Sequence, residues 1–167
     1  MKDIDVIQNQ LDRVLGFFPR VEGRISTLFG ANTLILAIAA LNLSAGDLRL
    51  WYVVMPALIL ISALLVSYFH LYKANFPDVT GGEGSLVFFK EVQKRTEANY
   101  LANFLACSED DYQKDLLGQV WRNSCILCDK YERVKHAIKA TAFSIIPFII
   151  FLAVTGTLHG RIPVLQG

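Results

Sequence analysis

The sequence predicts an all-α membrane protein with three transmembrane helices and a cytoplasmic helical bundle. Hydrophobic residues make up 53% of the 167 residues, and the mean hydropathy of +0.40 is well above what soluble chains need. Three windows contain no charged residue: 25–46, 50–69 and 140–158. Each is long enough to cross a hydrocarbon core of ~30 Å, which takes about 20 apolar residues. Because an amphipathic stretch precedes the first window and a second span follows closely, we expect no cleavable signal peptide.

Basic residues set the expected orientation. Four Lys or Arg residues precede the first window and ten lie between residues 73 and 139, whereas the turn between the first two windows has only Arg49. Lys and Arg beside spans concentrate on the cytoplasmic side, so we expect a multi-pass protein with a cytoplasmic N-terminus. The expected segments are a cytoplasmic amphipathic arm (1–24), two transmembrane helices (25–72), a cytoplasmic helical sensing region (73–139), a third transmembrane helix (140–160) and an external tail (161–167).

The N-terminal arm predicts an amphipathic helix. Its apolar residues form one stripe at helical spacing: Ile4, Ile7, Leu11, Val14 and Phe18. The stripe is narrow and acidic residues lie between its members, so we expect it to pack against other cytoplasmic helices rather than on lipid. Pro19 would bend the helix or restart it before the first span.

The central segment begins with a loop and continues as helices. Pro77 and the glycines of DVTGGEG predict a flexible loop after the second span. A helical pattern then starts at Ser85, with one face made of Phe89, Val92, Thr96, Tyr100, Phe104 and Cys107. In SEDD at 108–111, Ser108 lies three residues before Asp111, which is typical of a capping box and predicts that a new helix begins.

The helix after Ser108 is expected to be long. Its predicted seam alternates steps of three and four: Leu117, Val120, Ser124, Leu127, Tyr131, Val134 and Ile138. No Pro interrupts residues 110–146, so one helix of about 45 residues, ~70 Å at 1.5 Å per residue, would run from water into the third window, continuous with the third span. Such a helix would transmit a movement of its cytoplasmic half into the membrane, and Pro147 would let it bend.

Catalytic and metal-binding motifs do not occur. The sequence has no Gly-rich phosphate loop, HExxH, GxSxG or kinase signature, so we expect no enzyme and no catalytic residue. Cys125 and Cys128 form a CxxC, but structural zinc takes four ligands and only Cys107 and His136 could supply the others, so we expect no metal. A net charge of +1 gives no argument for a nucleic-acid polymer as partner. Spans without ionisable residues disfavour a transporter.

Aromatic and basic residues are mixed along the central segment. Those that could contact a nucleotide include Phe88, Phe89, Tyr100, Arg122, Asn123, Lys130, Tyr131 and Arg133. An aromatic ring stacked on a base, together with Arg or Lys on a phosphate, suffices to hold a nucleotide. Core packing is the competing explanation for Phe89, Tyr100 and Tyr131, because they lie on the predicted seams.

Four stretches carry a resemblance to a known family. GRISTLFGANTLILAI, SYFHLYKANFP, SLVFFKEVQKRTEANYLANFL and DLLGQVWRNSCILCDKYERVKHAI follow one another before a final span. This succession resembles the transmembrane effectors of Pycsar, the pyrimidine-cyclase system for antiphage resistance. The resemblance implies a bacterial inner-membrane protein without an enzymatic cofactor. Its activating ligand would be a cyclic nucleotide, a cyclic pyrimidine monophosphate, made by a cognate nucleotide cyclase. The activated effector would impair membrane integrity and thereby stop phage replication by abortive infection.

The resemblance also implies ligand contacts within the matching stretches. These are Arg24, Asn32, Phe88, Phe89, Tyr100, Lys130, Tyr131 and Arg133. The chain has Glu22-Gly23-Arg24 where the family often shows Asp-x-Lys, which keeps the charges and changes their reach. Separately, the small residues of the first span permit close helix contacts in the lipid bilayer, so we expect a homo-oligomer. They are Gly30, Ala31, Ala37, Ala39 and Ala40.

Two other functions fit the same sequence. A membrane effector gated by a cyclic oligonucleotide would use the same aromatic and basic residues. A non-enzymatic structural membrane subunit would instead bind a protein partner through its cytoplasmic helices. Comparing thermal stabilisation by cyclic mononucleotides and by cyclic dinucleotides distinguishes the first alternative from a cyclic-mononucleotide effector, because only a true ligand raises stability by mass action. A stable heteromeric complex would indicate the second.

Overall fold

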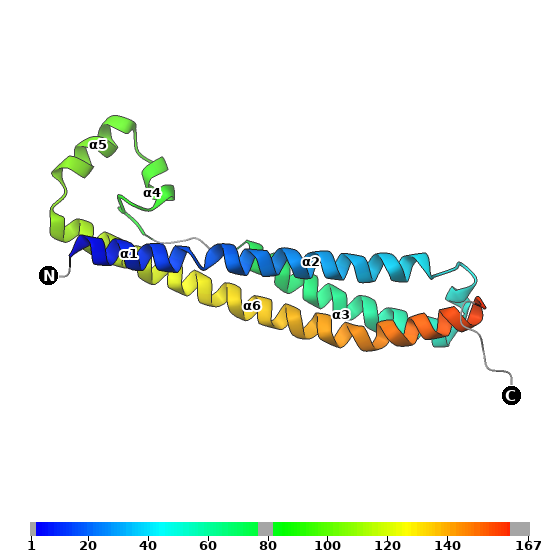
Figure 1. Cartoon of the computed structure of the whole chain (residues 1–167). Coiled ribbons are helices and arrows are strands. Elements are labelled where there is room, and N and C mark those ends of the chain that lie inside the picture. Colours follow the sequence, from blue (N-terminus) through cyan, green and yellow to red (C-terminus); the bar gives the residue numbers. More distant parts are fainter. Residues whose placement is uncertain (1–2, 77–81, 161–167) are drawn as a thin grey trace. The chain divides into compact units, whose positions relative to one another are not determined.

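The computed structural model describes residues 3–76 and 82–160, and within these ranges the chain forms helices and turns with no strand (Figure 1). The elements are α1 (Ile4–Leu15), α2 (Phe18–Leu41), the 3-10 helix η1 (Asp47–Arg49), α3 (Trp51–Asn75), α4 (Phe89–Gln93), α5 (Glu97–Ala106) and α6 (Glu109–Leu158). Three helical stretches are long and apolar enough to cross a membrane: Ile4–Leu41, Trp51–Asn75 and Glu109–Leu158. The predicted all-α class with three such helices is confirmed. The expected tail and the start of the predicted loop, at 161–167 and 77–81, lie outside the described residues.

The chain divides into two compact units. The first unit comprises residues 1–21 and 77–130, and the second comprises residues 22–76 and 131–167. α6 therefore contributes its residues up to Lys130 to the first unit and the remainder to the second.

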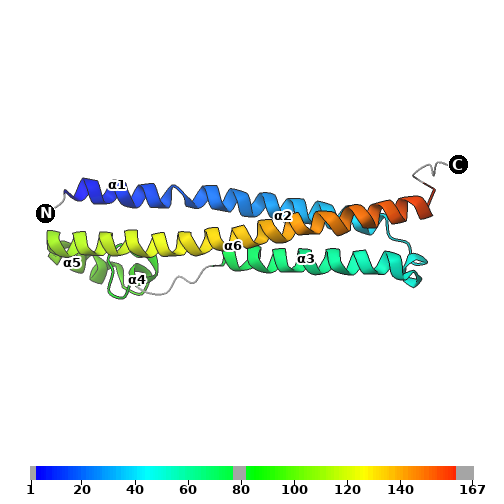
Figure 2. The ribbon, with the colours of Figure 1, turned by 90° about the horizontal axis from the view of Figure 1, so that it is seen from below.

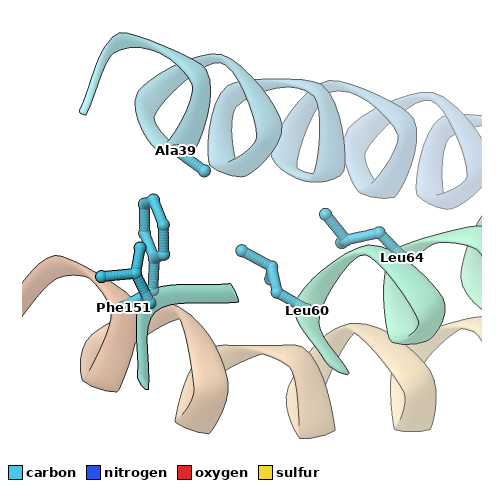
Figure 3. Close-up of a cluster of buried hydrophobic side chains, with 5 residues drawn as sticks. Ala39, Leu60, Leu64 and Phe151 are labelled. Atoms are coloured by element: carbon cyan, nitrogen blue, oxygen red, sulfur yellow. The ribbon is translucent and has the colours of Figure 1, made fainter. Parts of the chain in front are cut away.

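In the second unit, α2, α3 and the latter part of α6 run side by side (Figures 1 and 2). Figure 3 shows Ala39 of α2, Leu60 and Leu64 of α3, and Phe151 of α6 pointing toward one another. These side chains are at most 9% exposed. Large apolar residues also face outward on the same helices, which is the surface that a lipid solvent requires.

The turn between α2 and α3 is tied to the end of α6 by a polar contact. Asp47 of η1 is buried, and its carboxylate accepts a hydrogen bond from the Ser44 backbone N at 2.8 Å. The same carboxylate lies 3.3 Å from His159 Nε2. This contact fixes one end of the three-helix bundle.

In the first unit, α1 buries two residues of the predicted apolar stripe. Ile7 and Val14 are its buried residues, and Asp3 caps the helix by accepting a hydrogen bond from the Asp5 backbone N. α1 ends before α2 begins, with Pro19 in the first turn of α2, where its missing N–H costs nothing. The stripe thus packs on protein, and Pro19 accompanies a helix restart.

The single helix predicted from Ser85 is wrong in its extent. α4 and α5 are separate helices, and Thr96 between them caps α5 by accepting a hydrogen bond from the Asn99 backbone N at 3.3 Å. A hydroxyl at this position stabilises a helix start, so the predicted apolar face is divided between two helices. The start predicted at Ser108 is confirmed, because its Oγ accepts a hydrogen bond from the Asp111 backbone N at 3.2 Å.

The predicted seam of α6 is wrong at both ends and also at Ser124, which is exposed. Leu117 and Ile138 are 50% and 44% exposed, whereas Leu116 and Ala137, one position earlier, are buried. Polar residues make up much of the true buried face: Gln113, Gln119, Lys130, Ser144 and Thr155. A search for apolar periodicity could not find this face, because about half of its buried residues are polar.

Candidate functional site

Residues 82–88 form a loop that is folded onto the first unit, and we call it the pinned loop. Ser85 is 5% exposed. Its Oγ accepts hydrogen bonds from the backbone N of Val87 at 3.1 Å and of Phe88 at 2.9 Å, and from Nε2 of Gln119 on α6 at 3.0 Å. Ser85, which directly follows the predicted flexible loop, is therefore held by buried polar contacts.

Charged side chains secure the pinned loop further. Arg95 donates hydrogen bonds to the carbonyls of Ser85 at 2.9 Å and Gly84 at 2.7 Å. Asp115 of α6 accepts a hydrogen bond from the Leu86 backbone N at 2.7 Å. Hydrogen bonds to ionised groups are stronger than neutral ones. The loop is thus joined both to the segment after α4 and to α6.

Glu91 of α4 adds a titratable contact to the pinned loop. Its carboxylate accepts hydrogen bonds from Lys94 Nζ and from the Gly84 backbone N. The bond from Lys94 is the main cause that lowers the pKa of Glu91, and the bond from Gly84 acts in the same direction. The carboxylate is therefore charged at neutral pH and can hold the loop.

Arg122 lies against the pinned loop in a space that glycines leave open. A Cβ atom at Gly118 would lie 3.2 Å from Arg122 Nη2, and one at Gly82 would lie 3.3 Å from Arg122 Cζ. Arg122 Nη2 also lies 3.8 Å from Asp115 Oδ1. Within the described part of the chain, the buried Nε of Arg122 has no hydrogen-bond partner. The position of Arg122 thus depends both on the space beside the two glycines and on its ion pair with Asp115.

An aromatic groove of about 500 Å³ lies in the first unit. It is lined by Leu86, Val87, Phe89, Val92, Gln93, Tyr100, Phe104 and Tyr112. The ring of Phe104 is 5.9 Å from that of Tyr100 and 5.6 Å from that of Tyr112, centre to centre. The volume is in the range of small-molecule sites, and aromatic faces suit stacking on a base. No Lys or Arg is among the lining residues.

Six predicted contact residues belong to the first unit: Phe88, Phe89, Tyr100, Arg122, Asn123 and Lys130. The structure brings Phe89 and Tyr100 together in the groove, and Phe88 meets Phe89 edge to face at 5.0 Å. Asn123 donates a hydrogen bond to a carbonyl of its own helix. Lys130 is only 4% exposed, with its ammonium 5.7 Å from the ring centre of Phe18, so it lies in the interior.

The other four predicted contact residues, Arg24, Asn32, Tyr131 and Arg133, belong to the second unit. The Arg24 guanidinium lies 5.7 Å from the centre of the Tyr131 ring. This is a cation–π contact between α2 and α6. The structure thus brings Arg24 and Tyr131 together.

Asn32 belongs to a group that we call the interhelix polar cluster, with one member from each long helix of the second unit: Asn32, Ser67 and Thr141. Asn32 Nδ2 donates to Ser67 Oγ at 2.8 Å, and Thr141 Oγ1 donates to Asn32 Oδ1 at 2.9 Å. The Ser67 and Thr141 hydroxyls are 2.9 Å apart. Asn32 and Ser67 are fully buried, so both ends of the Asn32 amide are engaged inside the bundle.

Sequence reasoning missed the residues that hold the pinned loop. Ser85, Asp115 and Gln119 act through hydrogen bonds to backbone and side-chain groups, which leave no periodic signal. Phe104 was placed on the predicted face but not among ligand contacts, and Tyr112 was not singled out. Tyr112 could have been considered, because it is an aromatic residue in the first turn of the helix that Ser108 was predicted to begin.

Metal binding finds no support in the described ranges. No group of three or more His, Cys, Asp or Glu residues between 3 and 76 or between 82 and 160 could hold a metal ion. Cys125 and Cys128 are free, exposed thiols.

The fold and the groove define a class: a helical membrane protein in which a long helix is shared between an apolar three-helix unit and a unit with an aromatic groove. The family model described as the Pycsar effector protein domain matches residues 6–157. The chain therefore belongs to the Pycsar effector family, and it is a membrane effector of antiphage defence. No curated protein and no solved structure matches it.

Proposed function

We propose that this Pycsar effector binds a cyclic nucleotide in the aromatic groove and then impairs the integrity of the bacterial inner membrane. The ligand would be a cyclic pyrimidine monophosphate made by a cognate cyclase after phage infection. The observation that carries the proposal is an aromatic groove in a chain that matches the Pycsar effector domain.

The base would stack in the groove. Phe89 is 66% exposed, so its ring is available, and Tyr100 lies on the neighbouring helix α5. Stacking on an aromatic ring stabilises a bound base by about 1–3 kcal/mol. Gln93, which also lines the groove, offers both a donor and an acceptor to the edge of a pyrimidine.

The phosphate would be met by two basic side chains, Lys90 of α4 and Lys94 at the C-terminal cap of that helix. Lys90 and Lys94 each follow a groove-lining residue by one position, and they are four apart, so they share a helix face. Both are exposed. Arg122 would then be a positioning residue, because its guanidinium lies close beside Gly82 of the pinned loop that leads into α4.

The response would pass along α6. Tyr112 in the first turns of α6 lines the groove, and the same helix continues into the apolar bundle of the second unit. A ligand that closes the groove would shift α6 and change how spans of neighbouring subunits pack. Moving such an equilibrium from 1:99 to 99:1 takes about 5.5 kcal/mol of differential affinity, which several ligands bound to a homo-oligomer would supply more readily than one.

A ligand panel tests the proposal. The purified full-length chain in detergent would be heated with cyclic CMP, cyclic UMP, cyclic AMP or a cyclic dinucleotide. We expect a cyclic pyrimidine mononucleotide to raise the melting temperature, because binding at 100 times the dissociation constant stabilises by about 2.7 kcal/mol. Stabilisation by the cyclic dinucleotide alone would favour a cyclic-oligonucleotide effector, and stabilisation by none would reject both.

Groove variants locate the site. Phe89→Ala and Tyr100→Ala should each weaken binding by roughly 5- to 150-fold, from the loss of about 1–3 kcal/mol of stacking. Trp121→Ala is the matched control, because Trp121 is a 69% exposed aromatic residue of the same unit that does not line the groove. Equal losses in all three variants would contradict a site in the groove.

A further inference from the structure

A second groove, of about 610 Å³, lies between α3 and α6 in the second unit. Its lining residues are Leu58, Ile59, Ser62, Ala63, Val66, His70, His136, Lys139, Ala140 and Phe143. α3 and the latter part of α6 lie side by side in both views of the chain (Figures 1 and 2). The groove therefore runs along two helices that are apolar enough to cross a membrane.

The length of the groove matches one leaflet. From Leu58 to His70 the lining follows α3, and twelve steps at 1.5 Å give about 18 Å. Half of a hydrocarbon core of ~30 Å is about 15 Å. An extended acyl chain of one leaflet can therefore lie along the groove.

The groove is apolar along most of its length and polar at one end. Leu58, Ile59 and Phe143 lie away from that end, where the rings of His70 and His136 stack at 5.1 Å with an angle of 21° between them. Lys139 is one turn from His136 on the same helix and is exposed. One end of the groove thus carries a fixed positive charge and two imidazoles.

One nitrogen at the polar end is also unsatisfied. His70 Nδ1 is buried, and it has no hydrogen-bond partner among residues 3–76 and 82–160. A buried polar atom without a partner costs free energy. The exposed Lys139 and the two stacked imidazoles make this end of the groove the place for the polar head of a ligand.

We propose that the α3–α6 groove binds an anionic phospholipid, with one acyl chain along the apolar lining and the phosphate of the headgroup at His70, His136 and Lys139. A negative phosphodiester complements Lys139, whereas a zwitterionic headgroup brings its own cation to the same place. The bound lipid touches both α3 and α6, so it stabilises their contact. This inference is independent of the cyclic-nucleotide ligand and of the aromatic groove.

Lipid retention by the full-length chain tests the proposal. The protein in detergent would be incubated with phosphatidylglycerol or phosphatidylcholine of identical acyl chains, and retained lipids would be counted by native mass spectrometry. We expect phosphatidylglycerol to be retained preferentially and soluble glycerol phosphate not to compete at equal concentration. Equal retention of both lipids, or displacement of the lipid by glycerol phosphate, would overturn the proposal, since the second result indicates a site for free anions.

Two variants test separately the end of the groove that would bind the headgroup and the part that would bind the acyl chain. Lys139→Gln should lower the retention of phosphatidylglycerol about fivefold, as expected for one basic residue near a membrane surface, and leave phosphatidylcholine unchanged. Lys73→Gln is its control, because Lys73 is an exposed basic residue in the last turn of α3 outside the groove. Ser62→Phe, which fills the apolar part, should lower retention of both lipids.

The control for Ser62→Phe is Ile61→Phe, because Ile61 is the neighbouring residue, is 43% exposed and does not line the groove. Equal effects of Lys139→Gln and Lys73→Gln would show attraction to general surface charge and overturn the site. Equal effects of Ser62→Phe and Ile61→Phe would overturn the placement of the acyl chain.

Discussion

At the residue scale, Asn32 joins all three long helices of the second unit through a fully buried amide. Its nitrogen donates to Ser67 of α3 and its oxygen accepts from Thr141 of α6. Polar contacts between apolar helices stabilise a defined arrangement, on average by about 0.6 kcal/mol and by at most about 1.7 kcal/mol. The interhelix polar cluster therefore fixes the register of the bundle more than its total stability.

Replacing Asn32 tests this role. Asn32→Leu should lower the free energy of unfolding in detergent by about 0.6–1.7 kcal/mol, because Ser67 and Thr141 lose their shared partner. The measurement is thermal unfolding followed by circular dichroism. Thr27→Val is the matched control, since the Thr27 hydroxyl donates to Gly23 within its own helix at 2.9 Å. Equal losses in the two variants would contradict a special role for the cluster.

Two glycines of the pinned loop differ in their surroundings but not in their backbone. Gly82 and Gly84 both have φ of +78°, yet a Cβ at Gly82 would lie 3.0 Å from a Phe88 ring carbon, whereas one at Gly84 meets nothing within 4 Å. Both alanine variants should lose about 1–2 kcal/mol from the left-handed backbone. Gly82→Ala should lose more, because it also displaces Phe88 or Arg122. Thermal unfolding of the two variants checks the order, and an equal or smaller loss in Gly82→Ala would show that the loop is loosely packed.

At the element scale, α4 and α5 show where sequence patterns suffice and where they do not. The apolar spacing from Phe89 to Cys107 predicts helix correctly over most of these positions. It cannot show the break, because the break depends on the Thr96 hydroxyl, which caps α5. Likewise the predicted burial of Val134 is correct. Leu117 and Ile138 are exposed instead, and the residues that precede them are buried, because tertiary contacts decide which side of the helix is covered. Periodicity therefore finds elements, and side-chain hydrogen bonds decide their limits.

The junction of α4 with the pinned loop should depend on pH through Glu91. The hydrogen bond from Lys94 lowers the pKa of Glu91 in the folded protein below its ordinary value of 4.5. A lowered pKa means that the stabilisation is present above pH 4.5 and is lost as the pH falls through the folded-state value. Glu91→Gln should therefore lower the melting temperature at pH 7, and the difference from the wild type should shrink progressively as the pH falls below 4.5.

Lys94 supplies the control for this pH dependence. Lys94→Gln removes the main cause of the shift, so adding it to Glu91→Gln should change the melting temperature at pH 7 less than it does in the wild-type background. Additive effects would mean that the two side chains act independently.

At the scale of the whole molecule, the sequence was sufficient for the fold class, while the ligand contacts that it predicts stay predictions. Uncharged windows and basic flanks predict three apolar helices, since the bilayer imposes length and composition directly. Phe89 and Tyr100 were predicted as contacts and both line the aromatic groove. The contacts of Ser85, Asp115 and Arg122 could not be predicted, because they join the pinned loop to residues about 30 or more positions away in the chain.

Coupling through α6 can be tested without touching either groove. Glu132 and Lys135 are an exposed ion pair of α6 with a separation of 3.1 Å. Glu132→Gly with Lys135→Gly costs the helix about 2 kcal/mol relative to alanine at both positions, since each glycine costs about 1 kcal/mol. We expect the glycine pair to retain ligand binding and to lose most of the membrane response, and the alanine pair to retain both. Equal membrane responses in the two variants would indicate that α6 does not transmit the signal.

The central claim, that a cyclic pyrimidine mononucleotide acting on this chain impairs a membrane, is tested most directly by dye release. Purified protein would be reconstituted into liposomes that contain a self-quenched dye, and cyclic CMP and cyclic UMP would be titrated from outside and inside. The account predicts release that saturates with one of these nucleotides and is weakened in parallel with binding by Tyr100→Ala. Liposomes that stay sealed while the protein binds the nucleotide would contradict it.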